Sequence, residues 1–520
     1  NLVRTGIWTA WDEHCEPGRP VPTEAVLRAF EAWLLTARLY HMPVIFTFFA
    51  FVPPAWGGEN PYLDPRAVAA QSEFVAAFAR RFAPARDLAW DLINEPSFSS
   101  PQRLWQCRPN YDASEQAAWA AWLRRLAGGR DGEDLALFLQ DRWGAIDGDP
   151  TALPPLDDFA DRHLFGDARP RRAADYRRFA QDAFAGWTRQ LTAVIREAGD
   201  AAAGPAAGGS QVVAGAVDGP RQLVTVGQDE GGLYDRPGPL FFGPDVDFTC
   251  THTWWNNDDL LLDGVMARLP DRPLLIEETG LMTYERPDGT AWRDGEAQAH
   301  LLSRKLALAL AAGGAGFVQW CWNSNPYMPS DNEAGIGFLR ADRMWKPELA
   351  VFQRYARFLQ RHAALFHAME PEETIVVAPH SHLFSGRDLA TAATQRAVRT
   401  LEYELGLPVR AVAEHALTAM FPPAAPPATT AATATPKAPA TTANVAAAPK
   451  LIVLPSPRVL ADDAWAALLR AVDRGATLCV SGPFDRDEVE RPAGRAAALG
   501  LSAAALAAAD MLGISDLVQA

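Results

Sequence analysis

Two short segments, far apart in the chain, each end an apolar run in a carboxylate. The first, 88–96, reads LAWDLINEP, and the second, 273–280, reads PLLIEETG. An apolar run that is stopped by Pro or Gly is typical of a buried parallel strand that carries an acid at its C-terminal end. Hydrolysis of a glycosidic bond requires two carboxylates that face the same bond. Glu95 and Glu278 are therefore the candidate catalytic pair.

The second segment contains two adjacent acids, Glu277 and Glu278. Side chains alternate between the two faces of a strand, so we expect one carboxylate to point into the interior and the other toward covering helices. Glu278 shares its face with Ile276 and stands two residues before Gly280. This parity favours Glu278 as the inward-facing acid.

Strand-like and helix-like runs alternate over the first 360 residues, which predicts a parallel sheet covered by helices. The predicted strands contain Leu2, Val44, Leu88, Leu223, Phe248, Leu274 and Phe317. A (β/α)8 TIM barrel needs eight strands, and the alternation gives seven. Residues 1–5 read as the middle of a strand, so we expect the first strand of the barrel to be missing upstream of Asn1.

The paired acidic motifs resemble those of the clan-A glycoside hydrolases, especially their cellulase and β-mannanase branch. In that clan Asn-Glu-Pro ends the fourth strand, and a Glu two residues before a Gly ends the seventh. The resemblance covers about residues 1–360. It implies a retaining mechanism with Glu278 as the nucleophile and Glu95 as the acid/base, and it requires no cofactor and no metal.

The resemblance also implies substrate-binding roles near the two acids. Arg4 matches an Arg beside the nucleophile and would hold Glu278 ionised, while the charge of Glu278 would raise the pKa of Glu95. Asn94 would bond the sugar hydroxyl next to the anomeric carbon, and His252 matches a histidine on the sixth strand. The family usually has a Tyr that touches the nucleophile where this chain has Trp254.

Two tryptophans, Trp320 and Trp322, lie on one face of the last predicted strand of the barrel. One of them resembles the family's strand-eight Trp, which forms a platform for the sugar, and core packing is the interpretation for the other. The predicted strand at 44–51, VIFTFFAF, is the third strand of the barrel when the missing first strand is counted. It lacks the His that is common at this strand among cellulases, which argues against a cellulase.

Residues 97–172 form a long insertion in the predicted barrel, which spans 1–368. This insertion resembles the corresponding one in the family-forty-two β-galactosidases. A second, doubly wound α/β domain is expected over 371–520, interrupted by a disordered insert of Ala, Thr and Pro at 421–449. It resembles the amidotransferase-like domain of those enzymes, which mediates oligomer contacts without catalysis. Cys479 lies outside the Gly-x-Cys-x-Gly elbow of active amidotransferases, and we interpret it as a core thiol.

Composition restricts the other partners. The net charge is −15 and 17 tryptophans are present, which argues against a nucleic-acid partner and is compatible with stacking on carbohydrate. The five cysteines form no Cys/His cluster for zinc and no evident disulfide framework, and Cys250 and Cys321 are expected in the core. Neither a signal peptide nor a membrane span is visible, which slightly favours the cytoplasm, although the chain begins at Asn1 without a Met.

The expected function is hydrolysis of β-linked oligo- or polysaccharides by a retaining β-glycosidase. The resemblance of its C-terminal domain implies a homo-oligomer formed through that domain. A β-galactosidase proper is one alternative, and a catalytically silent carbohydrate-binding or assembly protein is another. The sequence leaves open whether galactose, mannose or glucose occupies the cleavage subsite, and whether cleavage is exo or endo.

Overall fold

The computed structural model divides into two compact units, Asn1–His367 and Ala368–Ala520. It describes residues 1–7, 11–50, 52–57, 60–96, 107–160, 171–203, 222–230, 233, 236–253, 257–281, 292–325, 327, 335–366, 372–385, 388–423 and 449–500. Trp254 and most of the Ala/Thr/Pro tract, 424–448, lie outside the described residues.

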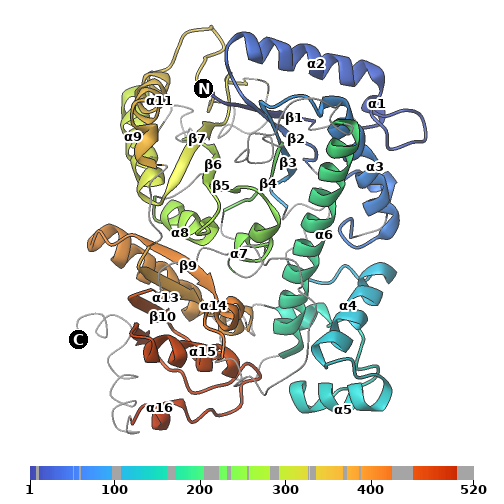
Figure 1. Cartoon of the computed structure of the whole chain (residues 1–520), viewed down its shortest axis with the longest axis vertical. Helices are drawn as coiled ribbons and strands as arrows, with labels where there is room; N and C mark the ends of the chain where they lie inside the picture. Colours follow the sequence, from blue (N-terminus) through green and yellow to red (C-terminus); the bar gives the residue numbers. More distant parts are fainter. Residues whose placement is uncertain are drawn as a thin grey trace, which may run out of the picture. The chain divides into compact units, whose positions relative to one another are not determined.

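The first unit is built on parallel strands that follow the order of the sequence (Figure 1). One sheet has the order β1-β2-β3-β4 and a second the order β5-β6-β7. These strands are β1 Val3–Gly6, β2 Val44–Thr47, β3 Leu88–Asn94, β4 Leu223–Gly227, β5 Thr249–Thr253, β6 Leu274–Thr279 and β7 Gly314–Gln319. Two backbone hydrogen bonds, Asp247 N to Val224 O at 2.8 Å and His252 N to Gln228 O at 2.7 Å, connect the two sheets. The seven described strands therefore form one curved parallel array.

Helices cover the outside of this array, as expected when parallel strands are linked by crossovers (Figure 1). The longer ones are α2 Glu24–Leu39, α3 Pro65–Phe82, α6 Arg171–Ala203, α8 Asn257–Ala267, α9 Gly295–Ala311 and α11 Pro347–Phe366. Shorter ones are α1 Trp11–His14, η1 Pro54–Trp56, α7 Pro239–Phe242 and η4 Gly243–Asp245. The segment after β3 contributes α4 Ala113–Leu126, α5 Gly132–Trp143 and η2 Leu156–Phe159.

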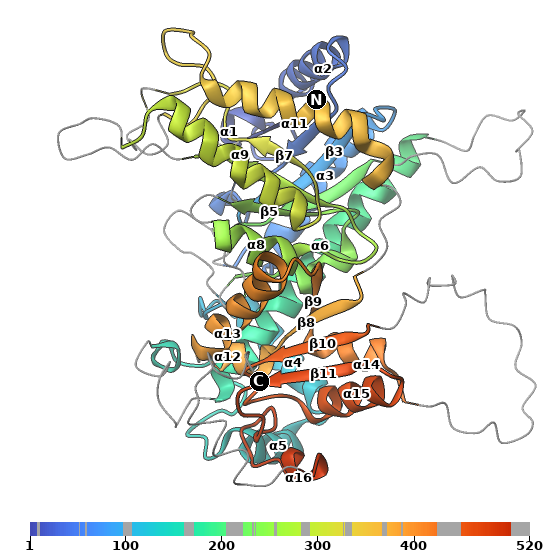
Figure 2. The same ribbon diagram turned by 90° about the vertical axis from the view of Figure 1, so that its left-hand side faces the viewer.

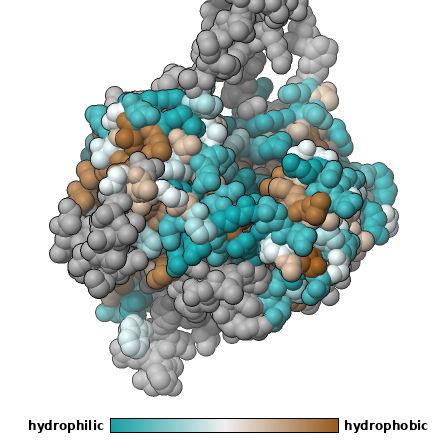
Figure 3. All heavy atoms as spheres, turned by 90° about the horizontal axis from the view of Figure 1, so that it is seen from below, coloured by the Kyte–Doolittle hydropathy of each residue, from teal (hydrophilic) through white to brown (hydrophobic). Residues whose placement is uncertain are grey.

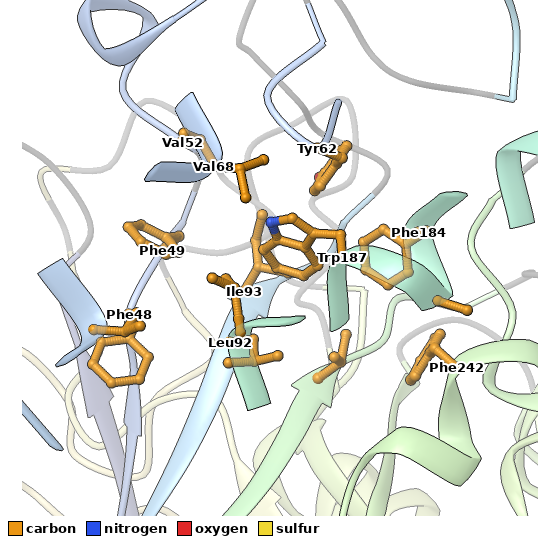
Figure 4. Close-up of a cluster of buried hydrophobic side chains, with 14 of the residues drawn as sticks. Phe48, Phe49, Val52, Tyr62, Val68, Leu92, Ile93, Phe184, Trp187 and Phe242 are labelled. Atoms are coloured by element: carbon orange, nitrogen blue, oxygen red, sulfur yellow. The ribbon is translucent and has the colours of Figure 1, made fainter. Parts of the chain in front are cut away.

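The packing between strands and helices is mainly aromatic. Phe48 stacks on Trp90 with ring centroids 4.9 Å apart, and Phe46 lies 5.1 Å from Phe78 of α3. Figure 4 shows the part of this core in which Leu92 and Ile93 of β3 meet Trp187 of α6. Because these side chains are fully or almost fully buried, the strand ends that carry the polar residues rest on rigid packing.

A smaller set of side chains points into the interior of the array. Ile45, Phe248 and Cys250 form a buried cluster against Leu2, Ala89 and Leu275. On β6, by contrast, Leu274 and Ile276 pack against Leu260 of α8 and Ala309 of α9. The inward face of β6 is therefore the face of Leu275 and Glu277, and the expectation that Glu278 shares an inward face with Ile276 is wrong.

The second unit has a parallel sheet with the order β11-β10-β8-β9 and helices on both faces (Figure 2). Its strands are β8 Thr374–Ala378, β9 Val409–Ala413, β10 Leu451–Pro455 and β11 Thr477–Ser481. Its helices are α12 His380–Phe384, α13 Asp388–Arg399, η5 Thr400–Glu404, η6 Glu414–Ala416, α14 Leu417–Met420, α15 Asp462–Asp473 and α16 Arg495–Ala498. A doubly wound arrangement of this kind agrees with the alternation in the sequence.

The cysteines differ in part from their expected places. Cys250 is buried, as expected, whereas Cys321 is half-buried and Cys479 on β11 is exposed. Cys479 is therefore not a core thiol, because it lies on the last strand of the sheet order, where an outward side chain has little to cover it.

The described surface carries no sign of a membrane-crossing element. None of the described helices combines the length and the apolar character that a bilayer span needs. On the face shown in Figure 3, hydrophobic residues form separate patches among hydrophilic ones.

Candidate active site

The C-terminal ends of the strands in the first unit bring together the polar residues that the sequence singled out. Arg4 lies on β1, Asn94 ends β3 and is followed by Glu95, His252 lies on β5, and Glu278 lies near the end of β6. Ligand sites of parallel α/β barrels lie at this end, because the loops that follow the strands meet there.

Arg4 is the cation at the centre of the group, with 4% of its side chain exposed. Its Nη1 donates to Glu278 Oε2 at 2.9 Å, and its Nη2 donates to Asp91 Oδ2 and Asn94 Oδ1, both at 2.8 Å. Because Arg4 occupies the acceptor oxygen of Asn94, the amide nitrogen of that side chain is left to donate to a ligand.

The carboxylates of Glu95 and Glu278 are the pair expected to act on the substrate. One oxygen of each, together with a ring nitrogen of His252, lies within 4.8 Å of the others. The side chain of Glu95 is 19% exposed and that of Glu278 is 10% exposed, so both acids retain access to the surface. His252 Nδ1 lies 2.9 Å from Glu95 Oε1. Because of this hydrogen bond, we interpret Glu95, His252 and Glu278 as a cluster that shares a proton and not as a metal site.

The backbone of Glu95 is held in the left-handed region, with φ of 48°. A non-glycine residue adopts this conformation when its surroundings impose it, and such residues gather at active sites. Here the Glu95 amide donates to the Gly227 carbonyl at 2.7 Å, and the β3–β4 register shifts between Asp91 and Asn94. The irregular strand end turns Asn94 and Glu95 toward the same group.

A second irregularity decides where the two glutamates of β6 point. The register with β5 shifts so that Thr251 pairs with Ile276 while His252 pairs with Glu278. Glu277 is therefore the extra residue of a bulge, and bulges re-aim side chains. Glu277 Oε1 lies 3.5 Å from Arg4 Nε, and Glu278 also contacts Arg4. The expectation that one of these acids faces the helices is wrong, because both face the cluster.

Two acids in the cluster were missed by the sequence analysis. Asp91 is fully buried, and its Oδ1 accepts from Gly227 N at 2.8 Å while its Oδ2 accepts from Thr47 Oγ1 at 2.7 Å. The sequence did contain a signal for Asp91, because it is an acid inside the apolar run 88–93. A carboxylate buried in a strand needs polar or charged partners nearby. Asp229 follows β4 and pairs with Arg236, beside Glu95.

The close packing of the cluster also favours glycine at position 227. A Cβ atom there would lie 3.0 Å from Arg4 Nη2, Asp91 Oδ2 and Glu277 Oε2. The absence of a side chain on β4 thus leaves room for the cation and its two buried acids.

The titration of the acids differs from the expectation. Burial raises the pKa of Glu278 to about 7, and the positive charges of His252 and Arg4 offset burial only in part. Burial would also raise the pKa of Glu95, but the hydrogen bond from His252 and the nearby positive charges lower it overall. Arg4 does lower the pKa of Glu278, as expected, but burial outweighs this effect; for Glu95 the hydrogen bond and charge of His252 outweigh burial.

His252 carries the proton that these acids share. Burial alone would lower its pKa, but the charge of Glu278 and the contacts with Glu277 and Glu95 raise it to about 10. A buried imidazole between several carboxylates stays protonated for this reason. Burial also raises the pKa of Asp91 to about 6, so Asp91 is a further acid of the cluster that titrates near neutral pH.

The two tryptophans after β7 are less buried than expected. Trp320 is half-buried and lines a cavity of about 800 Å³ together with Glu278. Trp322 is 57% exposed and meets Trp345 edge-on, with ring centroids 5.6 Å apart. Neither tryptophan is buried, so the expectation that one of them packs in the core is wrong.

Comparison with known proteins shows which structures share this fold. No family model and no curated protein matches the sequence. Solved structures of glycosidases match it over most of its length, at 15% sequence identity or less. The chain therefore shares the fold of these enzymes, and the resemblance to clan-A glycoside hydrolases is confirmed at the level of the fold.

Three of these structures illustrate the similarity. A β-galactosidase from the Antarctic haloarchaeon Halorubrum lacusprofundi has a TM-score of 0.66 at 15% identity, covering 95% of this chain and 72% of its own. A GH42 β-galactosidase from G. stearothermophilus also has a TM-score of 0.66, at 14% identity, covering 95% and 69%. The exo-β-1,4-mannosidase Op5Man5 from Opitutaceae bacterium strain TAV5 has a TM-score of 0.54 at 14% identity, covering 96% and 73%.

Proposed function

We propose that the protein is a β-glycosidase that hydrolyses its substrate with retention of configuration. The proposal rests on one observation above all: an oxygen of Glu95 and an oxygen of Glu278 lie within 4.8 Å of each other. Retaining enzymes hold their two carboxyl groups about 5–5.5 Å apart, whereas inverting enzymes leave room for a water molecule at about 6.5–9.5 Å. The glycosidase fold supports the same reaction class.

Each acid has a role that its surroundings support. Glu278, bonded to Arg4, attacks the anomeric carbon and forms a glycosyl-enzyme. Glu95 gives a proton to the leaving oxygen, and His252 Nδ1, 2.9 Å away, supplies that proton to Glu95. Glu95 then accepts a proton from the water that hydrolyses the intermediate. Asn94 donates from its amide to the neighbouring sugar hydroxyl.

Screening with chromogenic aryl β-galactosides, β-mannosides and β-glucosides tests the proposal. Release of the aryl group from at least one of these sugars is the expected result, and it identifies the sugar at the cleavage subsite. A folded protein that binds β-linked oligosaccharides but cleaves no aryl glycoside would contradict the proposal and favour a silent carbohydrate-binding protein.

The pH dependence of kcat/KM follows from the raised pKa values of Glu278 and His252. Glu278 attacks in its ionised form, so the rate rises with pH through about 7. The His252–Glu95 pair must hold a proton, so the rate falls as His252 loses its proton near pH 10. Because kcat/KM reports the free enzyme, we expect a bell-shaped profile with its plateau between these values. A profile with both limbs below pH 6 would contradict this assignment of protons.

We propose further that the gap between β1 and β7 takes an eighth parallel strand. Both strands are partly exposed, and the cavity between them is lined by Leu2, Val3, Gly316, Phe317 and Val318. Parallel barrels close when each strand bonds to two neighbours. In the 520-residue chain, the amides of β1 and β7 should therefore exchange with solvent faster than those of β2 and β3. Equal protection of all four strands would show that the gap is already closed.

A further inference from the structure

Glu277 is a buried acid to which the proposed reaction assigns no step. Its side chain has no exposed surface, in contrast to the partly exposed Glu95 and Glu278. A sugar therefore has no exposed atom of this side chain to contact, although the residue borders the cavity that Glu278 and Trp320 line. A fully buried carboxylate persists in a folded protein when neighbouring cations compensate its charge.

Glu277 lies between two cations. Its Oε1 is 3.5 Å from Arg4 Nε, and its Oε2 is 3.6 Å from His252 Nε2. Each cation reaches a catalytic carboxylate with another nitrogen: Arg4 Nη1 is 2.9 Å from Glu278, and His252 Nδ1 is 2.9 Å from Glu95. The side chains thus form a chain of alternating charge, with Glu277 at its centre.

The other charged groups described in the cluster contact different nitrogens of Arg4 and His252. Asp91 bonds Arg4 through Nη2. Glu278 lies 3.7 Å from His252 Nδ1, the ring nitrogen that also faces Glu95. Asp229, which follows β4, also interacts with His252 through its charge. Cys250 faces Glu277 from β5 as a neutral thiol, because burial raises its pKa. Among the described acids, Glu277 is the one whose carboxylate contacts both Arg4 Nε and His252 Nε2.

We propose that Glu277 is a positioning residue that fixes Arg4 against Glu278 and keeps Nε2 of His252 protonated, so that Nδ1 faces Glu95. This inference rests on the proposed function for its catalytic consequence. Its structural part, the charge and orientation of His252, does not require turnover. The lowered pKa of Glu277, to which the charges of Arg4 and His252 contribute against burial, agrees with an ionised side chain.

Replacing Glu277 by Gln keeps the shape of the side chain and removes its charge. We expect kcat on an aryl glycoside to fall about 10²-fold with KM changed by less than about threefold, because the catalytic groups remain but lose their alignment. The alkaline limb of the pH profile should move to lower pH, since His252 loses an anionic neighbour. Glu277→Asp, which retains the charge, should restore most of this limb. The matched control is Glu133→Gln on the exposed part of α5, which makes the same change in net charge.

Two readouts separate this inference from the proposed function. The ¹⁵N shifts of the His252 ring at pH 8 should be those of an imidazolium in the parent protein, and in Glu277→Gln the change to the shifts of a neutral ring should occur at lower pH, whether or not any substrate is cleaved. A 2,4-dinitrophenyl 2-deoxy-2-fluoro-glycoside of the sugar found in the screen should label Glu278 and leave Glu277 unlabelled.

An unchanged His252 spectrum and an unchanged alkaline limb in folded Glu277→Gln would overturn the positioning role. A covalent label on Glu277 would overturn it too, while the proposed function would stand with a different nucleophile. If Glu277→Gln does not fold, the Glu277→Asp protein decides: a displaced Nε2 signal with the imidazolium retained supports the inference, and a spectrum identical to that of the parent contradicts it.

Discussion

Replacing Glu278 by Ala is expected to abolish turnover on every substrate, with a fall in kcat on the order of 10⁵-fold, because no glycosyl-enzyme forms without the nucleophile. Steady-state release of an aryl group measures this directly. Arg4 would lose the acid that its Nη1 contacts at 2.9 Å, but it would keep Asp91 and Glu277, so the fold should be retained.

The adjacent acid provides the control for this prediction. If Glu277→Ala is inactive while Glu278→Ala is active, the roles of the two glutamates must be exchanged. Adding azide gives a second check, because azide that replaces a missing nucleophile forms an α-glycosyl azide. Such a product from Glu95→Ala in place of Glu278→Ala would exchange the roles of the acid/base and the nucleophile.

Replacing Glu95 by Ala is expected to have a large effect that depends on the leaving group. For a substrate whose leaving group needs a proton, kcat/KM should fall by about 10²–10⁴-fold, the usual contribution of a general acid or base. For a dinitrophenyl glycoside, whose leaving group departs without a proton, the first step should be nearly unchanged. Added azide should then restore turnover and yield a β-glycosyl azide.

The outcome that contradicts this role is a loss that does not depend on the leaving group. An equal fall for dinitrophenyl and alkyl glycosides, without rescue by azide, would mean that Glu95 has a structural role only. Glu95→Gln is a useful second variant, because the amide oxygen of Gln can still accept the hydrogen bond from His252 Nδ1 but the side chain is no longer an acid.

Much of the barrel could be predicted from the sequence because each strand is an apolar run of limited length. The two acidic motifs of β3 and β6 end at the same side of the sheet, and the structure brings Glu95 and Glu278 together. Arg4, Asn94 and His252 join them, and these three depended on the resemblance to a known clan. At 15% identity or less, the spacing of such motifs was a stronger guide than overall similarity.

The local geometry of β6 could not be predicted in the same way. Strict alternation along a strand holds only where the register is regular, and the bulge at Glu277 breaks it. No feature of the sequence PLLIEETG marks this bulge, because it depends on the pairing of β6 with β5. The inward position of both glutamates follows from that pairing and not from parity.

The protonation of the cluster was also beyond the sequence. The pKa of Glu278 depends on its burial, and that of Glu95 depends on the hydrogen bond from His252, which lies 157 positions away in the chain. Pairing of Arg4 with Glu278 alone leaves out two effects: burial, which raises the pKa of Glu278, and the contact with His252, which lowers the pKa of Glu95.

The stereochemistry of the first product tests the central claim most directly. Proton NMR during the first minutes of hydrolysis of an aryl β-glycoside distinguishes the two anomers before mutarotation mixes them. The short separation of Glu95 and Glu278 predicts that the β-anomer appears first, followed by the α-anomer as the solution equilibrates. Initial release of the α-anomer would mean inversion, and it would contradict the assignment of Glu278 as a nucleophile.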